Sequence, residues 1–152
     1  MRGMKRKALS LIELMVAVGI MVIGLTAVLA SYANMFILGD IARDLSRATN
    51  AARAKMEEIK QLEFDSLDAL NATTFDLEGF NTTDARGRIE IRNVTGGSNL
   101  KEVRIVACFR SRNRVIGEDA NLNGALDTEA SEDKNYNGRL DCPVELITLL
   151  AD

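Results

Sequence analysis

Two hydrophobic patterns follow one another along the first 61 residues of this 152-residue chain. An almost uninterrupted apolar run extends from Leu14 to Leu29 and continues, with few polar residues, to Leu38. From Ile41 onward, apolar residues recur at spacings of three and four, with charged residues between them. That spacing is typical of an amphipathic helix. Together the two patterns predict one helix over residues 9–61.

The amphipathic part, residues 39–61, predicts a helix that buries one face and exposes its charged residues, Asp44 among them, to water. We expect this face to lie on a small sheet. A coiled coil with another chain is the alternative, although the apolar stripe is short for sustained heptads. The expected packing positions are Ile41, Leu45, Ala48, Ala52, Met56 and Ile59.

The apolar part, residues 9–38, is long enough to cross a bilayer, because about 20 helical residues span the roughly 30 Å hydrocarbon core. Residues 1–8 contain four basic residues and no acid, which places the start of the chain in the cytoplasm. The run is too long for an ordinary signal peptide, and no small-residue cleavage site follows it. A plain signal anchor remains the simplest alternative.

Glu13 lies at the edge of this apolar segment, where a carboxylate is costly and usually marks a functional pairing. Residues 7–16, Lys-Ala-Leu-Ser-Leu-Ile-Glu-Leu-Met-Val, resemble the processing motif of type IV prepilins. The resemblance implies that prepilin peptidase cuts between Ala8 and Leu9, that the Leu9 amine is methylated, and that Glu13 neutralises a neighbouring subunit's amine. Ala8 departs from the glycine preferred in the family. Ala30 replaces the proline common in major pilins, which favours a minor pilin or pseudopilin.

The same resemblance implies a structural role without catalysis, in a type IV pilus or a type II secretion pseudopilus. The protein would be a single-pass inner-membrane protein with its carboxy-terminal domain in the periplasm, and would later lie in the filament. Its partners would be prepilin peptidase, an inner-membrane assembly platform and other pilin subunits. Residues 54–60 look most like V-type minor pilins, with I-type secretion pseudopilins close behind.

Residues 62–152 predict a small periplasmic domain, so the expected fold is α+β with an antiparallel sheet of three or four strands. Residues 88–92 alternate with period two, a Gly-Gly-Ser-Asn turn follows, and residues 100–109 are rich in Val and Ile. This order predicts a hairpin whose second strand turns Val103, Ile105, Ala107 and Phe109 to one face. Residues 144–150 predict a further strand. Residues 62–86 show no sustained period and predict a connecting loop.

Cys108 and Cys142 are the only cysteines, and both lie beyond the apolar segment, in a compartment expected to be oxidising. We expect a disulfide between them. In the chain-entropy model, closing a loop of about 35 residues stabilises the fold by roughly 4 kcal/mol. Two free buried thiols are the alternative.

A short duplication with a period of 14 residues occupies residues 118–141. Each copy places oxygen-bearing side chains at its first, third, fifth and ninth positions and glycine at its sixth, which is the spacing of a loop that wraps Ca²⁺. The carbonyls of Ala125 and Arg139 would supply the seventh-position ligand, and Leu126 and Leu140 would point inward. The expected side-chain ligands are Asp119, Asn121, Asn123 and Asp127 for one ion, and Asp133, Asn135, Asn137 and Asp141 for the other.

Neither copy carries the closing glutamate of an EF-hand loop, because Ala130 and Val144 stand in its place. Glu129, Glu132 or a carboxylate from the other copy would complete the ligand set. Bound Ca²⁺ would be a structural cofactor that offsets repulsion among clustered carboxylates. The alternative is that Asp, Asn and Gly only build turns here.

Composition argues against other function classes. The net charge is −3 and there is no histidine, which indicates neither a nucleic-acid-binding surface nor histidine acid–base chemistry. Ser10 and Ser31 lie in the apolar segment without a base, so the chain is not expected to be an enzyme. The alternative to a filament subunit is a membrane-anchored periplasmic calcium-binding module that Ala8 protects from processing.

Overall fold

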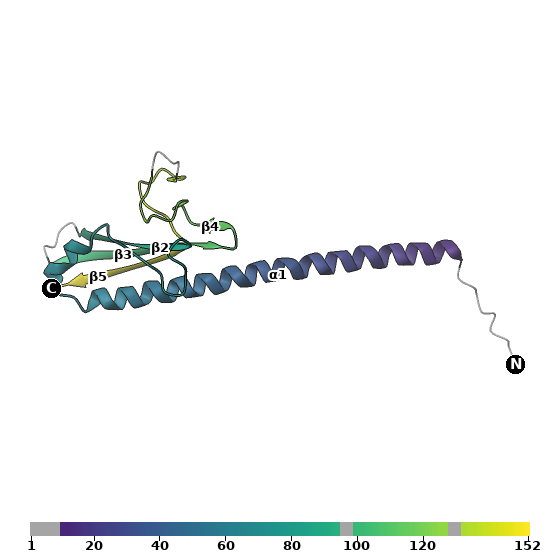
Figure 1. Ribbon diagram of the computed structural model, residues 1–152, viewed down its shortest axis with the longest axis horizontal. Helices are drawn as coiled ribbons and strands as arrows, with labels where there is room; N and C mark the ends of the chain where they lie inside the picture. Colours follow the sequence, from purple (N-terminus) through teal and green to yellow (C-terminus); the bar gives the residue numbers. More distant parts are fainter. Residues whose placement is uncertain (1–9, 95–98, 128–131) are drawn as a thin grey trace. The chain divides into compact units, whose positions relative to one another are not determined.

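The computed structural model describes residues 10–94, 99–127 and 132–152 (Figure 1). The chain divides into two compact units, Met1–Gly39 and Asp40–Asp152. The elements are α1 (Leu11–Lys60), the 3₁₀ helix η1 (Phe64–Leu70), β1 (Thr74–Phe75), β2 (Ala85–Asn93), β3 (Leu100–Ser111), β4 (Arg114–Ile116) and β5 (Val144–Ala151).

Helix α1 is one continuous helix of 50 residues, which confirms the single long helix expected from the sequence. Its start follows from the sequence Ser-x-x-Glu, because the backbone N–H of Glu13 donates to Ser10 Oγ at 3.2 Å and so caps the first turn. The helix is long and apolar enough to cross a membrane. It ends at Lys60, one residue before the predicted end.

The second half of α1 packs on the sheet of its own chain. Its buried apolar residues are Ala48, Ala52, Met56 and Ile59, and they join one core with the inward face of β3. The small alanine side chains allow a close approach of the helix to the strands. This arrangement confirms the expected packing of an amphipathic helix on a sheet.

The prediction was wrong about where the packed face of α1 begins. Leu45 is 37% exposed and Ile41 is only half-buried, whereas the charged Asp44 is 8% exposed. Asp44 is buried because strand β3 ends beside it, where Ser111 Oγ donates to Asp44 Oδ2 at 2.8 Å. The hydrogen bond compensates for burial of the polar group.

The sheet has five antiparallel strands, one more than the upper expectation. Strand β3 pairs with β2 on one edge and with both β4 and β5 on the other, while β1 extends the β2 edge. The register places Ile91 opposite Val103 and Ala107 opposite Val144. The predicted hairpin and last strand are therefore confirmed, and the four residues predicted to face inward on β3 are all buried. The Gly-Gly-Ser part of the predicted turn lies outside the described residues.

The predicted loop over residues 62–86 is wrong, because the segment contains η1, β1 and the start of β2. Leu67 and Leu77 anchor it in the core. A helix of seven residues and a strand of two are too short to impose a period on the sequence. Gly87 permits the contact with β1, since a Cβ there would lie 2.3 Å from a ring carbon of Phe75.

Cys108 and Cys142 form the expected disulfide, with 4.9 Å between their Cα atoms. The alternative of two free thiols is thus excluded. Gly117 lies beside the bridge with φ 122°, and a Cβ there would be 2.2 Å from Cys108 Sγ. Backbone conformation and space both require glycine at this position.

Candidate functional site

The processing motif lies at the amino-terminal end of α1. Ala8 and Leu9, the expected cleavage and methylation residues, are outside the described part of the chain. Glu13 lies in the first turn of the helix and is exposed, where its negative charge is favoured by the helix dipole. Among the described residues, no cation pairs with its carboxylate.

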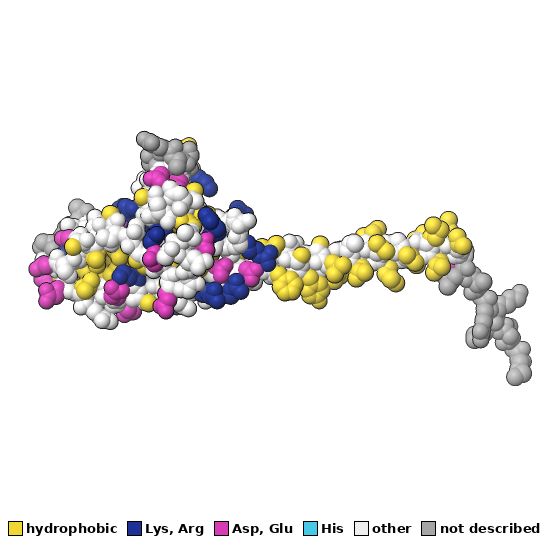
Figure 2. All heavy atoms as spheres, in the orientation of Figure 1, with side chains coloured by type: hydrophobic (Ala, Val, Ile, Leu, Met, Phe, Trp, Pro, Cys, Tyr) yellow, Lys and Arg dark blue, Asp and Glu magenta, His cyan; other side chains and the backbone are white. Residues whose placement is uncertain are grey.

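The part of α1 before Gly39 is predominantly apolar, and Figure 2 shows yellow apolar side chains along its visible face. None of its residues from Leu11 to Leu38 is buried within the described structure. An apolar surface of this extent requires lipid or other apolar helices around it.

The two copies of the duplicated segment each fold into a loop around their aspartates. In the first copy, Asp119 is fully buried, and its two carboxylate oxygens accept the backbone N–H groups of Asn123 and Gly124 at 3.0 and 2.7 Å. Asp127 Oδ2 accepts the side-chain amides of Asn121 and Asn123 at 2.8 and 2.9 Å. The four side chains expected as ligands therefore converge on one place.

The second copy repeats these contacts. The carboxylate of Asp133 accepts the backbone N–H groups of Asn137 and Gly138 at 3.0 and 2.9 Å. Asp141 Oδ2 accepts the side-chain amides of Asn135 and Asn137 at 2.6 and 2.9 Å. The duplication in the sequence is thus a duplication of hydrogen-bonded structure.

The backbone explains the glycine at the sixth position of each copy. Gly124 and Gly138 have φ of 77° and 68°, in the left-handed region that glycine tolerates. The fourth positions, Leu122 and Tyr136, also have positive φ, at 57° and 59°. Gly124 additionally lies against β1, where a Cβ would be 2.4 Å from Thr74 Cγ2.

The apolar residues of the loops differ from the expectation. Leu140 is buried as predicted, but Leu126 is only half-buried and Leu122 takes its place inside. Tyr136, the counterpart of Leu122, is 91% exposed. The first loop therefore buries the residue at its fourth position, and the second loop buries the residue at its eighth.

Two glutamates link the loops reciprocally, a role that sequence reasoning missed. Glu132, which directly precedes the second copy, accepts backbone N–H groups of the second and ninth residues of the first copy at 2.9 and 3.0 Å. Glu118, which directly precedes the first copy, accepts the equivalent groups of the second copy, both at 3.3 Å. The signal was present in the sequence as a glutamate before each first aspartate. Both carboxylate oxygens of Glu132 thus accept backbone N–H groups, and Glu129, the other glutamate expected as an extra ligand, lies outside the described residues.

The donor chemistry of the loops fits a hard cation in part. Among the described residues, no group of three or more His, Cys, Asp and Glu side chains is placed to hold a metal ion. Each loop instead offers two aspartates and two asparagines, all oxygen donors of the kind that Ca²⁺ takes. Asn123 Oδ1 accepts the Ala125 N–H at 2.6 Å, and Asn137 Oδ1 accepts the Arg139 N–H at 2.7 Å. The asparagine amides would have to turn in order to present these oxygens to an ion.

Burial raises the pKa of the Asp119 carboxyl, and the nearby Glu132 carboxylate raises it further. The N–H groups of Gly124 and Asn123 act in the opposite direction. A buried negative charge at this position would gain from a cation close by.

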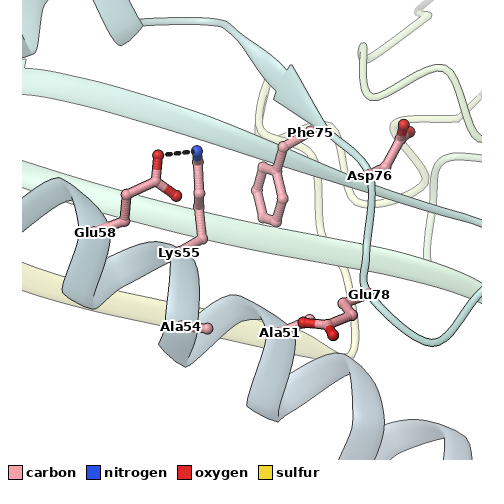
Figure 3. Close-up of a pocket in the computed structure, with 7 residues that line it drawn as sticks. All are labelled: Ala51, Ala54, Lys55, Glu58, Phe75, Asp76 and Glu78. Atoms are coloured by element: carbon pink, nitrogen blue, oxygen red, sulfur yellow. Dashed lines mark hydrogen bonds and ion pairs between the residues drawn. The ribbon is translucent and has the colours of Figure 1, made fainter.

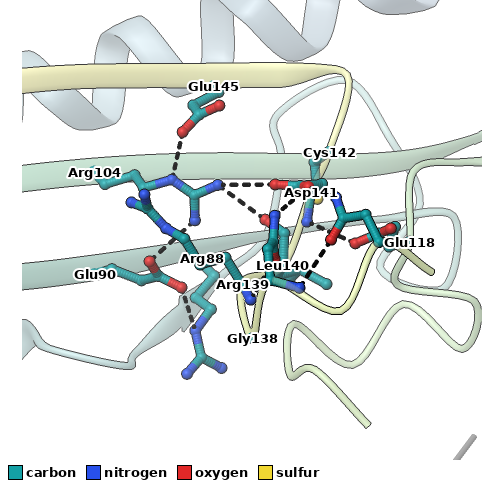
Figure 4. Close-up of polar contacts among 12 residues, drawn as sticks. Arg88, Glu90, Arg104, Glu118, Gly138, Arg139, Leu140, Asp141, Cys142 and Glu145 are labelled. Carbon is teal, nitrogen blue, oxygen red and sulfur yellow. Dashed lines mark hydrogen bonds and ion pairs between the residues drawn. The ribbon is translucent and has the colours of Figure 1, made fainter. Parts of the chain in front are cut away.

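Arg104, on β3, connects the second loop to the sheet through hydrogen bonds and ion pairs (Figure 4). Its side chain is almost fully buried, and its Nε donates to Glu145 at 2.5 Å while Nη1 donates to Glu90 at 3.0 Å. Its Nη2 donates to the Leu140 carbonyl at 3.0 Å and lies 3.5 Å from Asp141 Oδ1. Burial lowers the pKa of Arg104, but the two glutamates outweigh that effect and the pKa lies above its ordinary value. Arg104 therefore stays charged.

Arg88 on β2 makes the corresponding contact with the first loop, because its Nη1 donates to the Gly124 carbonyl at 2.7 Å. Each loop is thus attached to the sheet by an arginine from a different strand. The arginines were not predicted as part of the site, since period-two alternation only showed that they face away from the helix.

A separate groove of about 230 Å³ lies between α1 and β1 (Figure 3). Lys55 lies across it, paired with Glu58 at 2.7 Å and with its Nζ 6.0 Å from the centre of the Phe75 ring. The groove shares Ala51, Ala54 and Glu78 with a neighbouring depression. The described residues that line the groove include carboxylates but no Ser, Thr, Cys or Tyr side chain that could act as a nucleophile beside them.

Comparison with known families identifies the amino-terminal segment as a prokaryotic N-terminal methylation motif. Residues 3–29 match the sequence model of this motif. The match supports a type IV pilin-like protein, whose apolar helix fits a single-pass inner-membrane anchor and whose motif implies processing by prepilin peptidase and assembly with other pilin subunits. No curated protein and no solved structure matches the chain.

Proposed function

We propose that this protein is a minor pilin or pseudopilin that is processed between Ala8 and Leu9, methylated at the Leu9 amine and assembled through α1. The observation that supports the proposal best is the coincidence of two features. The methylation motif covers residues 3–29, and the same segment forms a capped helix with an exposed Glu13 and an apolar surface.

Assembly would exchange lipid for neighbouring helices around the apolar half of α1. Glu13 would then pair with the methylated amine of an adjacent subunit, in surroundings of low dielectric constant where opposite charges attract strongly. Because one carboxylate meets one amine, the pairing would set the register between subunits. The absence of proline from residues 11–60 agrees with the uninterrupted helix and with a minor subunit.

The test is the intact mass and amino-terminal sequence of the protein recovered from native membranes or sheared filaments. A chain that begins at Leu9 with one added methyl group is expected. A chain that begins at Met1 would contradict the proposal and favour a membrane-anchored calcium-binding module. Glu13→Gln should leave cleavage intact but reduce recovery in sheared filaments, whereas Glu57→Gln, on an exposed part of α1, should not.

We also propose that the paired loops bind two Ca²⁺ ions as a structural cofactor in the periplasm. The support is the convergence of Asp and Asn side chains at matching positions of both copies, together with buried charge at Asp119. Asp119, Asn121, Asn123, Asp127 and the Ala125 carbonyl would hold one ion. Asp133, Asn135, Asn137, Asp141 and the Arg139 carbonyl would hold the other.

Isothermal titration of the full chain in detergent with Ca²⁺ tests this second proposal. About two ions per chain are expected, with a higher melting temperature that chelator reverses. Asp127→Ala together with Asp141→Ala should abolish both effects. The control Asp65→Ala, which removes an exposed carboxylate on η1, should retain them. Unchanged melting with Ca²⁺ and with chelator would show that the repeat only builds turns.

A further inference from the structure

Four arginines gather where the charged part of α1 begins. Arg43 and Arg47 lie one turn apart on the helix. Arg112 lies in the turn between β3 and β4, and Arg114 is the first residue of β4. Arg112 Nη2 lies 2.7 Å from Asp40 Oδ2, so this turn lies beside the first charged residue of α1 after Glu13.

Two acids, Asp40 and Asp44, offset only part of the charge of these four arginines. Arg43 lies 3.5 Å from each of the two carboxylates, and Asp40 also pairs with Arg112. Within the described residues, Arg47 and Arg114 are exposed and have no ion-pair partner. The whole chain carries −3 even with its basic first residues, so this group is a local positive region on an otherwise acidic protein.

The conformation of the turn holds the positive region in place. Arg112 has φ 54°, in the left-handed region that residues with a side chain rarely adopt. Such a conformation persists only where surrounding contacts maintain it. Here Arg112 Nε donates to Asp40 Oδ2 at 2.8 Å, which fixes the tip of the turn against α1.

The position along α1 indicates what faces these arginines. Met35, Phe36 and Leu38 are 67, 70 and 65% exposed, so apolar surface that needs lipid reaches to Leu38 before assembly. Asp40 follows two residues later, about 3 Å along a helix. The headgroup layer on each side of the hydrocarbon core is roughly 5–7 Å thick. With residues up to Leu38 in the bilayer, Asp40 and the Arg112 guanidinium that pairs with it would lie at the depth of the lipid phosphates.

We propose that Arg47 and Arg114, assisted by Arg43 and Arg112, bind the phosphate groups of anionic phospholipids in the periplasmic leaflet of the inner membrane. Guanidinium groups suit phosphate because they donate two parallel hydrogen bonds. The contact holds the folded domain on the membrane surface until the subunit is extracted into a filament. It is independent of calcium binding by the loops.

A tryptophan reporter tests this proposal, since the chain contains no tryptophan. Full-length Asn113→Trp is reconstituted into vesicles of phosphatidylcholine, with or without phosphatidylglycerol, that carry a headgroup spin label. Quenching of the tryptophan should rise with phosphatidylglycerol. Tyr136→Trp, a reporter at the exposed tip of the second loop, should show no such rise.

The double variant Arg47→Gln with Arg114→Gln, placed in the Asn113→Trp chain, should weaken the preference for phosphatidylglycerol about 30-fold, as expected from the attraction of two basic residues to an anionic surface. Both side chains are exposed and unpaired, so the unfolding midpoint should stay unchanged. Equal quenching in the two lipid mixtures, or an unaltered preference in the double variant, would overturn the proposal. Loss of quenching with inorganic phosphate, but not with chloride of equal ionic strength, would also overturn it by indicating a free-anion site.

Discussion

The helix-and-sheet core and the paired loops are stabilised by different kinds of contact. In the core, residues 48–59 of α1 bury apolar side chains against β2, β3 and β5. In residues 118–141, carboxylates accept backbone N–H groups at defined positions, and only Leu122 and Leu140 among the described apolar residues are buried. Apolar packing tolerates varied sequence of the right size. Carboxylate-to-backbone contacts require particular residues at particular positions.

Truncation of a side chain in the apolar core should lower the free energy of unfolding the most. Ile105 is fully buried at the centre of β3, so Ile105→Ala should lower the free energy of unfolding by about 2–5 kcal/mol through lost burial and an added cavity. Denaturant unfolding of the full chain in detergent measures this. Ile147→Ala, at a 54% exposed position on β5, should cost less than about 1 kcal/mol. A similar loss of stability in both variants would mean that the core does not depend on the buried side chains of β3.

Removal of the disulfide should have the next largest effect on the free energy of unfolding, and in the native state it should loosen the loops more than the core. Cys108→Ser with Cys142→Ser should cost about 2–4 kcal/mol, because the unfolded chain gains freedom. Hydrogen exchange should increase more over residues 118–141 than over α1. Uniform acceleration across both regions would contradict the distinction between core and loops.

The reciprocal glutamates give a smaller, graded effect. Glu132→Gln should cost about 1–3 kcal/mol, because it weakens two part-buried hydrogen bonds to a charged acceptor. Glu118→Gln should cost less, since Glu118 is more exposed and its two contacts are longer, at 3.3 Å. Amide exchange at Asp127 and Asp141 reports each contact separately. The test is which of the two variants loses more stability. A larger loss for Glu118→Gln than for Glu132→Gln would refute the assignment of Glu132 as the main link between the loops.

The smallest effect is expected at the polar contact inside the core. Ser111→Ala removes the donor to the buried Asp44 and should cost about 1 kcal/mol. Ser46→Ala, at an exposed position of α1, should cause no loss. If Ser111→Ala proves equally neutral in thermal unfolding, then water satisfies Asp44 and the helix-sheet contact depends on apolar packing alone.

The sequence predicted the core well where one period persisted over many residues. The helix over residues 11–60 and the strands around Ile91, Val103 and Leu146 follow from such periods. The start of the packed face of α1 could not be predicted from such a period. Burial of Asp44 depends on where β3 ends, which is a tertiary feature. Strand β4 and helix η1 escaped prediction because three and seven residues cannot establish a pattern.

In the loops, repetition predicted which side chains meet, since Asp119 and Asp127 and their counterparts come together as the spacing required. It did not predict Glu118 and Glu132, because the ligand pattern of a single loop contains no partner copy. The arginines of the sheet were missed for a related reason. Arg88 and Arg104 lie far from the loops in sequence, and only the strand register brings them to the Gly124 and Leu140 carbonyls.

The two ends of the duplicated segment meet at one point, where the Glu118 N–H donates to the Asp141 carbonyl at 2.9 Å, directly beside the bridge between Cys108 and Cys142. The segment is therefore an insertion between two strands that does not interrupt the pairing of either with β3. In evolutionary terms, such a segment can be gained, lost or exchanged as a unit while the helix and sheet persist. The glutamate exchange adds a condition, since loss of one copy would deprive the other of its partner. We expect relatives of this protein to carry both copies or neither.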